Sequence, residues 1–221
     1  MDRVLEESLM INKDQVEAWN SAHRQFTIDG FVEWFKHRKD KQGLIVDIGC
    51  GTGTLAFSLL DEFPNLKIKG FDGSPAMIDY VERTIKEKSL EDSYSVECKM
   101  IEDIEPIPEC KTIISLGVLH HFADPMVFWK SLDRISPPGS VWMILDIHRA
   151  KDENEINEII EIVSGTNKNN QLYIDDLANS LRAAFTEQEI RDQLSSLGLR
   201  FSIDLHINPV AGEIMMIQVK K

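Results

Sequence analysis

The sequence predicts an α/β domain in which helices cover both faces of a mostly parallel β-sheet. From about residue 44 onward, short apolar runs alternate with amphipathic segments, which is the pattern of strands joined by helical crossovers. Residues 44–48, 68–71, 112–116 and 141–147 are almost continuously apolar, as in strands buried on both faces. The 221 residues suffice for one domain with a sizeable core, so we expect a single domain over residues 1–221.

Capping residues mark the starts of three helices. Ser74 and Asp124 each place a side-chain oxygen before a proline that suits the first helical position, and an apolar stripe follows each of them. The helix after Asp124 should stop at the Pro-Pro-Gly sequence of residues 137–139. The Thr-Glu-Gln-Glu sequence of residues 186–189 is a capping-box signature, and Gly198 would close the helix that it opens.

The rest of the chain flanks this core at residues 44–147. Residues 1–43 contain two amphipathic patterns that predict an N-terminal helical cap. Residues 148–182 contain one more predicted helix followed by a loop at 165–170, and we interpret them as a lid or substrate-binding insertion, with simple covering helices as the alternative. In residues 183–221, the helix at 186–198 precedes an antiparallel hairpin, because strand patterns at 201–207 and 214–219 flank a turn at 208–212.

Charge and composition exclude several classes of partner. The 37 acidic and 24 basic side chains give a net charge of −13, which repels polyanions, so we expect no nucleic-acid partner. We find no apolar stretch long enough to span a bilayer and no apolar signal core at the N-terminus, so we expect no membrane partner. The three cysteines are too few and too irregularly spaced for a disulfide framework. We therefore expect a cytoplasmic protein.

A glycine-rich turn joins the first predicted strand to a helix. Gly49, Gly51 and Gly53 follow that strand, and without a Cβ they allow a tight turn and a close approach of a ligand to the backbone. The N-terminus of the next helix adds unpaired amide donors. The turn is therefore typical of a cradle for a nucleotide-like ligand.

A carboxylate, Asp72, stands at the end of the second predicted strand, beside that turn. At this place a carboxylate can accept hydrogen bonds from both hydroxyls of a ribose. A dinucleotide fingerprint starting at Gly49 and Gly51 would need its third glycine at position 54, where this chain has Thr54. Asp47 also precedes the turn, where a carboxylate would face a cationic amino-acid ligand better than a pyrophosphate. Thr54 and Asp47 therefore argue against a dinucleotide, and Asp47 is placed where it could face a cationic amino-acid ligand.

At this point a family resemblance is clear in three segments. Residues 47–53 resemble the first motif of class I S-adenosylmethionine-dependent methyltransferases, and residues 69–77 resemble the second motif. Residues 114–122 resemble the fourth motif in the form common among small-molecule methyltransferases of the quinone-biosynthesis kind. The three segments cover roughly residues 44–147, which would be the cofactor-binding half.

The resemblance implies a fold, a cofactor and a set of binding residues. The fold would be a Rossmann-like three-layer sandwich with a seven-stranded, mostly parallel sheet and one antiparallel strand near the C-terminus. The cofactor would be S-adenosylmethionine, with S-adenosylhomocysteine as the product. The expected cofactor-binding residues, from the methionine end past the ribose to the adenine, are Asp47, Gly49, Cys50, Gly51, Asp72, Gly73, Ser74, Met77, Met100, Ile101 and Leu116.

One segment departs from the family pattern. The family often has an acidic residue that contacts the adenine amino group, but residues 99–103 align ambiguously with it. We place Met100 or Ile101 at that position, with Glu102 or Asp103 as the alternative. Which residue meets the adenine is left open.

The predicted reaction is transfer of a methyl group to a small-molecule acceptor. Such a displacement needs alignment and exclusion of water rather than a catalytic triad, so no catalytic residue is assigned. His120 and His121 follow a strand at the ligand-binding edge, and Arg149 ends another strand; all three are candidates for a substrate role. The alternatives are a structural role for the histidines and an ion pair of Arg149 with Asp152 or Glu153.

Other functions stay open at this stage. An NAD-dependent oxidoreductase and a non-catalytic cofactor-binding module are the alternatives to a methyltransferase. We expect no metal, because adjacent histidines should diverge and the sequence gives them no acidic or cysteine partner at ligand spacing. A homodimer is left open, as are the acceptor and its nucleophilic atom.

Overall fold

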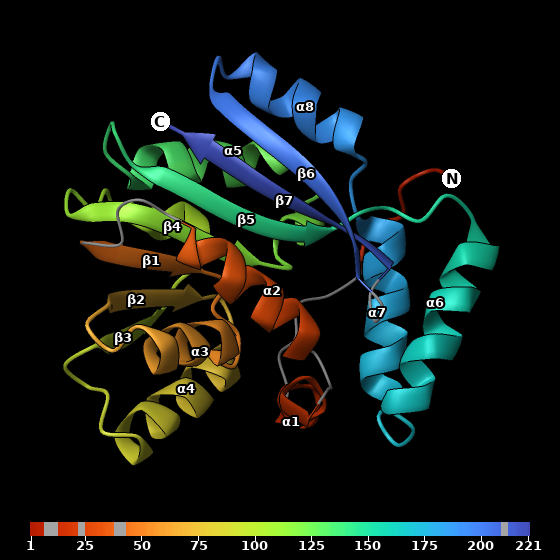
Figure 1. Cartoon of the computed structure of the whole chain (residues 1–221), viewed down its shortest axis with the longest axis horizontal. Coiled ribbons are helices and arrows are strands. Elements are labelled where there is room, and N and C mark those ends of the chain that lie inside the picture. The colour runs from red at the N-terminus through yellow and green to blue at the C-terminus, as the bar shows by residue number, and fades with distance from the viewer. Residues whose placement is uncertain (7–12, 22–24, 38–42, 209–211) are drawn as a thin grey trace.

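The computed structural model describes residues 1–6, 13–21, 25–37, 43–208 and 212–221. A seven-stranded sheet with the order β3-β2-β1-β4-β5-β7-β6 forms its centre (Figure 1). The strands are β1 Leu44–Ile48, β2 Lys67–Asp72, β3 Tyr94–Cys98, β4 Cys110–Leu116, β5 Val141–Ile147, β6 Arg200–Asn208 and β7 Gly212–Lys220. Strands β1 to β5 are parallel, and β7 is antiparallel to both β5 and β6. The mostly parallel sheet with one antiparallel strand is therefore confirmed.

Helices cover both faces of the sheet, which gives three layers. They are α1 Lys13–Ser21, α2 Gln25–Lys36, α3 Thr54–Glu62, α4 Pro75–Glu87, α5 Pro125–Ile135, α6 Glu153–Thr166, α7 Gln171–Ala183 and α8 Glu187–Ser196. Helices α2, α3 and α4 lie on one face, and α5 and α8 lie on the other (Figure 1). Two short 3-10 turns, η1 Ile101–Asp103 and η2 Leu119–His121, follow β3 and β4. None of the described helices is both long and apolar enough to cross a membrane.

Each face of the sheet has its own apolar core. Phe31, Leu59 and Val81 are fully buried on the side of α2, α3 and α4. Trp129 and Trp142 are fully buried on the side of α5, with their rings stacked at 6.5 Å between centroids. Both indole N–H groups have acceptors, at 2.8 Å and 2.9 Å, so that their burial leaves no donor unpaired. These two cores hold the strand ends rigidly where the site forms.

The capping residues act as the sequence indicates. The Ser74 hydroxyl accepts from the Met77 amide at the start of α4, and Asp124 accepts from the Met126 amide at 2.9 Å at the start of α5. Thr186 and Glu189 form the complete capping box of α8. These contacts satisfy amides that a helix start leaves unpaired.

Two elements differ from the expectation. Strand β3 was not predicted, because in this edge strand only Tyr94 is fully buried and the apolar signal is weak. Residues 148–182 contain two helices instead of one, and α6 continues to Thr166, past the expected loop start. Helix α7 begins where Asn170 accepts from the Tyr173 amide at 3.2 Å. The α6–α7 pair stands beyond the carboxyl ends of the parallel strands (Figure 1).

Candidate functional site

A cavity of about 580 Å³ opens at the carboxyl ends of β1, β2 and β4. This volume is within the usual range for small-molecule and cofactor sites. All the cofactor-binding residues expected from the sequence line it: Asp47, Gly49, Cys50, Gly51, Asp72, Gly73, Ser74, Met77, Met100, Ile101 and Leu116. The structure therefore brings the set together around one space, while contact of each residue with a cofactor stays a prediction.

The glycine turn after β1 is fastened to the end of β2. The amides of Gly49 and Cys50 both donate to the carbonyl oxygen of Phe71, at 2.8 and 3.0 Å. Gly49 has a φ of +67°, and a Cβ there would lie 2.4 Å from Val118. Gly51 also has a positive φ, but no heavy atom lies within 4 Å of where its Cβ would be. The turn thus requires glycine at residue 49 for packing and leaves open space beside Gly51.

Asp72 holds the turn and the next helix together. Its Oδ2 accepts from the Gly51 amide and its Oδ1 accepts from the Ser74 amide, both at 2.8 Å. Burial raises the pKa of Asp72, and these two hydrogen bonds partly offset the rise. Each carboxylate oxygen keeps a further lone pair for a ligand. The side chain is therefore fixed in an orientation that suits a vicinal diol.

Asp47 lies deeper in the same wall of the cavity. Its side chain is 2% exposed, and among the described residues its Oδ2 has no hydrogen-bond partner. Burial, together with the nearby Asp72, raises the pKa of Asp47 to about 8. The raised pKa keeps Asp47 mostly protonated at neutral pH in the ligand-free cavity, and a ligand with an ammonium or sulfonium group would favour its ionised form. The two acidic side chains beside the glycine turn therefore fit a cationic ligand better than a pyrophosphate.

The opposite part of the cavity is mostly apolar. Met77, Ile101 and Leu116 line it, and a Cβ on Gly73 would lie 2.6 Å from the Met100 sulfur, so glycine lets Met100 pack closely there. Glu102 lines the cavity as well. Apolar side chains on both sides suit a flat aromatic base. Two predictions for the residue that meets the adenine therefore stay open: Met100 or Ile101, and Glu102 or Asp103.

The thiol of Cys50 is buried, so this residue contributes to the cavity as a small wall residue. Burial, with the neighbouring Asp47 and Asp72, raises the pKa of Cys50 well above its usual range. Its backbone amide already donates to Phe71. A neutral, buried thiol is unsuited to nucleophilic attack.

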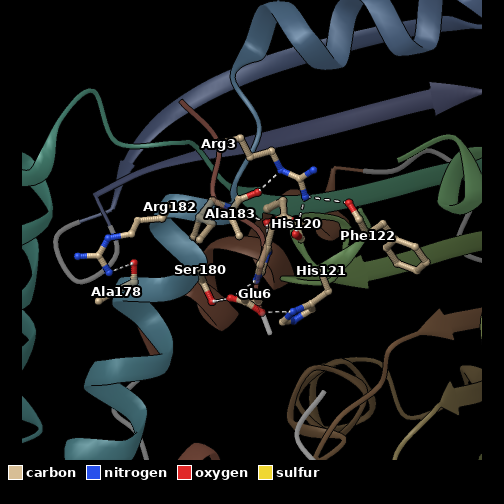
Figure 2. A network of polar contacts seen from close by, with 11 residues as sticks. Arg3, Glu6, His120, His121, Phe122, Ala178, Ser180, Arg182 and Ala183 are labelled. Carbon is tan, nitrogen blue, oxygen red and sulfur yellow. Dashed lines mark hydrogen bonds and ion pairs between the residues drawn. The ribbon is translucent and has the colours of Figure 1, made fainter. Parts of the chain in front are cut away.

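Two histidines and a glutamate meet beside the cavity (Figure 2). His121 lines the cavity, and its Nδ1 hydrogen-bonds with the carboxylate of Glu6. His120 is buried, and its Nδ1 lies 2.6 Å from Asp146 Oδ1 at the end of β5. The two imidazole centroids are only 4.2 Å apart. The expectation that the adjacent histidines diverge is wrong, because η2 is a tight turn and both rings meet carboxylates from distant parts of the chain.

Opposite charges on the glutamate and the histidines of this group shift the pKa values of Glu6 and His120. Burial alone would raise the pKa of Glu6, but the hydrogen bond from His121, the charges of both histidines and the Ser180 hydroxyl lower it to about 2. The Ser180 hydroxyl donates to Glu6 Oε1 at 2.6 Å. Burial lowers the pKa of His120, but the Asp146 carboxylate and the charge of Glu6 together raise it, and the net shift is upward. Glu6 is therefore a carboxylate throughout the physiological range.

Arg3 fastens the N-terminal segment over the loop after β4. Its guanidinium donates to the carbonyl oxygens of His120, Phe122 and Ala183 at 2.9, 2.8 and 2.5 Å (Figure 2). Its Cζ also lies 3.9 Å from the centroid of the Phe185 ring. Sequence reasoning missed Arg3 and Glu6, since both act across more than 110 residues and residues 1–6 carry no periodic pattern.

Arg149 does not belong to this site. It is not among the residues that line the cavity, and its Nη2 lies 2.8 Å from Glu189 Oε1 on α8. The alternative, an ion pair with Asp152 or Glu153, is wrong in its partner: Arg149 pairs with Glu189, because its amide donates to the Phe185 carbonyl just before α8. A substrate role for Arg149 has no support in the described part of the chain.

Comparison with known proteins agrees with this geometry. The model of the family described as "Methyltransferase domain" matches residues 39–195. A tRNA U34 carboxymethyltransferase of Sulfurimonas denitrificans is 32% identical over 165 residues, which is 70% of this chain and 52% of the relative. A malonyl-[acyl-carrier protein] O-methyltransferase of Ilyobacter polytropus is 43% identical over 86 residues, which is 39% of this chain and 30% of the relative. The chain spans about half or less of the length of these relatives.

Solved structures share the fold. A SAM-dependent methyltransferase from Aquifex aeolicus superposes with a TM-score of 0.71 at 15% identity, covering 95% of this chain and 98% of the other. The plantazolicin methyltransferase BpumL, solved with a substrate analogue and SAH, gives a TM-score of 0.71 at 15% identity over 95% of this chain and 90% of the other. Because the family model covers most of the sequence, the chain belongs to the family of methyltransferase domains.

Proposed function

We propose that this chain transfers a methyl group from S-adenosylmethionine to a small-molecule acceptor. The observation that carries the proposal is the pair of carboxylates beside the glycine turn, with Asp47 Oδ2 buried and unpartnered among the described residues. A buried acid without a partner is costly, and a cationic ligand would supply one. The same two acids cannot pair with the pyrophosphate of a nicotinamide dinucleotide, which disfavours the oxidoreductase alternative.

Different cavity residues would bind different parts of the cofactor. Asp47 would face the amino group of the methionine end beside Gly49 and Gly51, and Asp72 would accept from the ribose hydroxyls. Met77, Met100 or Ile101, and Leu116 would enclose the adenine. When bound, the cofactor supplies an activated methyl group on a sulfonium. The chain's own contribution is to hold that group in line with the acceptor and to exclude water.

The acceptor would enter beside the loop that follows β4. His121, Phe122, Ala123 and Asp124 line this part of the cavity, and Ile28 of α2 closes it from the N-terminal side. Helix α1 and the α6–α7 pair stand at this end of the sheet (Figure 1), while α2 covers one face and contributes Ile28 to the cavity. This arrangement supports the interpretation of these segments as a cap and an insertion for substrate binding. A cavity whose mouth is bordered in this way favours a compact acceptor.

A tRNA acceptor is the second candidate, favoured by the similarity to a tRNA U34 carboxymethyltransferase. The net charge of −13 opposes it, since binding of a polyanion needs neutralisation of its phosphates by basic side chains.

Methyl-labelled S-adenosylmethionine separates the two acceptor classes. The purified chain would be incubated with a low-molecular-mass cell extract and, separately, with total tRNA, and Asp72→Ala would serve as the inactive control. We expect label in the small-molecule products of the wild type alone. Label that enters only tRNA would favour the second candidate. Cofactor binding without label in either pool would favour the non-catalytic module.

A further inference from the structure

We infer that Glu6, His120 and His121 bind a divalent transition metal ion, with Zn²⁺ as the favoured ion, at the edge of the cofactor cavity. One nitrogen of each histidine and one oxygen of Glu6 all lie within 4.8 Å of one another. Two imidazoles and one carboxylate are a common ligand set of catalytic zinc sites, which leave further coordination positions open. Binding of the ion does not depend on the proposed methyl transfer.

A buried imidazole nitrogen points to the missing ligand. His120 Nδ1 faces Asp146 Oδ1 at 2.6 Å, so the Nδ1–H donates to this carboxylate, and Nε2 is the nitrogen whose lone pair a metal ion would take in place of a proton. His120 is 3% exposed, and its Nε2 has no hydrogen-bond partner among the described residues. Glu6 Oε1 lies 3.9 Å from this Nε2. At 3.9 Å the two atoms are too far apart for a direct hydrogen bond, and a cation between them could bind to both.

Asp146 completes the pattern of a metal site. A metal-binding histidine almost always donates its other N–H to a carboxylate or carbonyl, which fixes its orientation. Asp146 does this for His120 and also accepts from its backbone amide at 3.3 Å. The Ser180 hydroxyl similarly orients Glu6, at 2.6 Å. Two of the three ligands are therefore held by partners of their own.

Side-chain rotations would suffice to form the site. Zinc bonds of about 2.0 to 2.2 Å place tetrahedral donors about 3.4 Å apart, so Glu6 and Nε2 of His120 would approach and the Glu6–His121 hydrogen bond would give way to two metal bonds. Arg3 already holds the N-terminal segment in place by donating to the His120 carbonyl at 2.9 Å (Figure 2). Glu6 would thus be brought to the ion by an anchored backbone.

The position of the ion suggests its use. Because His121 lines the cavity, an ion bound through it would lie where the acceptor enters. An acceptor hydroxyl or thiol bound to the ion would release its proton to solvent. The oxygen or sulfur would then bond to the methyl carbon as the carbon–sulfonium bond breaks, leaving neutral S-adenosylhomocysteine. This use rests on the proposed function and predicts an acceptor with a hydroxyl or thiol group.

Titration of the chelator-treated 221-residue chain with Zn²⁺ by calorimetry tests the site, and Co²⁺ serves as a spectroscopic probe. We expect one equivalent to bind, with an affinity at least tenfold lower in Glu6→Gln and His121→Ala. Asp146→Asn should weaken binding by about 10- to 100-fold. His37→Ala and Cys98→Ser should bind like the wild type, because both side chains are exposed and lie outside the group.

Three results would overturn the inference: no binding by the wild type, equal binding by His121→Ala, or loss of binding in Cys98→Ser. Circular dichroism of each variant confirms that it is folded, and Glu6→Gln keeps the shape of the side chain if His121→Ala does not fold. S-adenosylhomocysteine is titrated in parallel. If S-adenosylhomocysteine binds and zinc does not, the metal site alone is rejected. If zinc binds and S-adenosylhomocysteine does not, the proposed function alone is rejected.

Discussion

At the scale of single residues, Asp47 and Asp72 decide which ligand the cavity favours. Asp72 is fixed by two amide donors at 2.8 Å, while Asp47 is buried with one oxygen unpartnered among the described residues. The first is arranged to receive hydroxyls and the second to receive a cation. Each of these roles gives a prediction.

Asp72→Ala should weaken the binding of S-adenosylhomocysteine by about 1.5 to 3 kcal/mol, the usual range for hydrogen bonds to a charged group. Calorimetry gives the dissociation constant. Asp133→Ala is the matched control, since Asp133 is a carboxylate on α5 that pairs with Lys221 and does not line the cavity. An unchanged affinity in Asp72→Ala would remove the ribose assignment.

Asp47 should make the ligand-free protein less stable as the pH rises. Its folded-state pKa of about 8 lies above the ordinary value of 3.8, so the folded state binds the proton more tightly between these values. The free energy of unfolding should then fall by at most about 1.4 kcal/mol per pH unit in this window. Urea unfolding at pH 5 and pH 8 measures the fall, which Asp47→Asn should reduce. A fall of equal size in the variant would contradict the assignment.

The sequence predicted the cavity residues better than the group beside it. Asp47, Gly49, Gly51 and Asp72 could be found because turn chemistry and strand ends fix their places locally. Glu6 could not be found, because its contact with His121 depends on how the N-terminal segment crosses the folded domain. For the same reason, the sequence did not predict that the rings of His120 and His121 lie close together.

At the scale of elements, burial explains which parts of the fold were predictable. Strands β1 and β5 have the predicted bounds, since both are buried on both faces and their sequences are continuously apolar. Edge strand β3 lacks that signal. Helix α7 was missed although Tyr173, Ile174, Leu177 and Leu181 form its buried stripe, because its start is capped by Asn170 inside what reads as a polar loop.

The glycine turn gives a prediction with a control in the same chain. Gly49→Ala should destabilise the protein by about 1 to 3 kcal/mol or more, since its φ of +67° strains an L-residue and its Cβ would meet Val118 at 2.4 Å. Gly165→Ala, in helix α6 with no atom within 4 Å of its Cβ, should stabilise it by about 0.4 to 1 kcal/mol. Urea unfolding measures the change in the free energy of unfolding for both variants. Equal changes in the two variants would contradict the packing of Gly49 against Val118.

At the scale of the whole molecule, the sheet order and the charge act together. The carboxyl ends of β1, β2 and β4 meet at one edge, which places the turn, Asp72 and the loop after β4 around one cavity. The net charge of −13 favours cationic and neutral ligands over polyanions. The homodimer that the sequence left open stays a prediction, which sedimentation analysis would test.

Calorimetric titration of the wild-type chain with S-adenosylmethionine, with NADH as the competing ligand, tests the central claim most directly. The account predicts saturable binding of S-adenosylmethionine at one site and no binding of NADH, because Asp47 and Asp72 can pair with a cationic ligand and cannot pair with a pyrophosphate. Saturation by NADH with no heat from S-adenosylmethionine would contradict it.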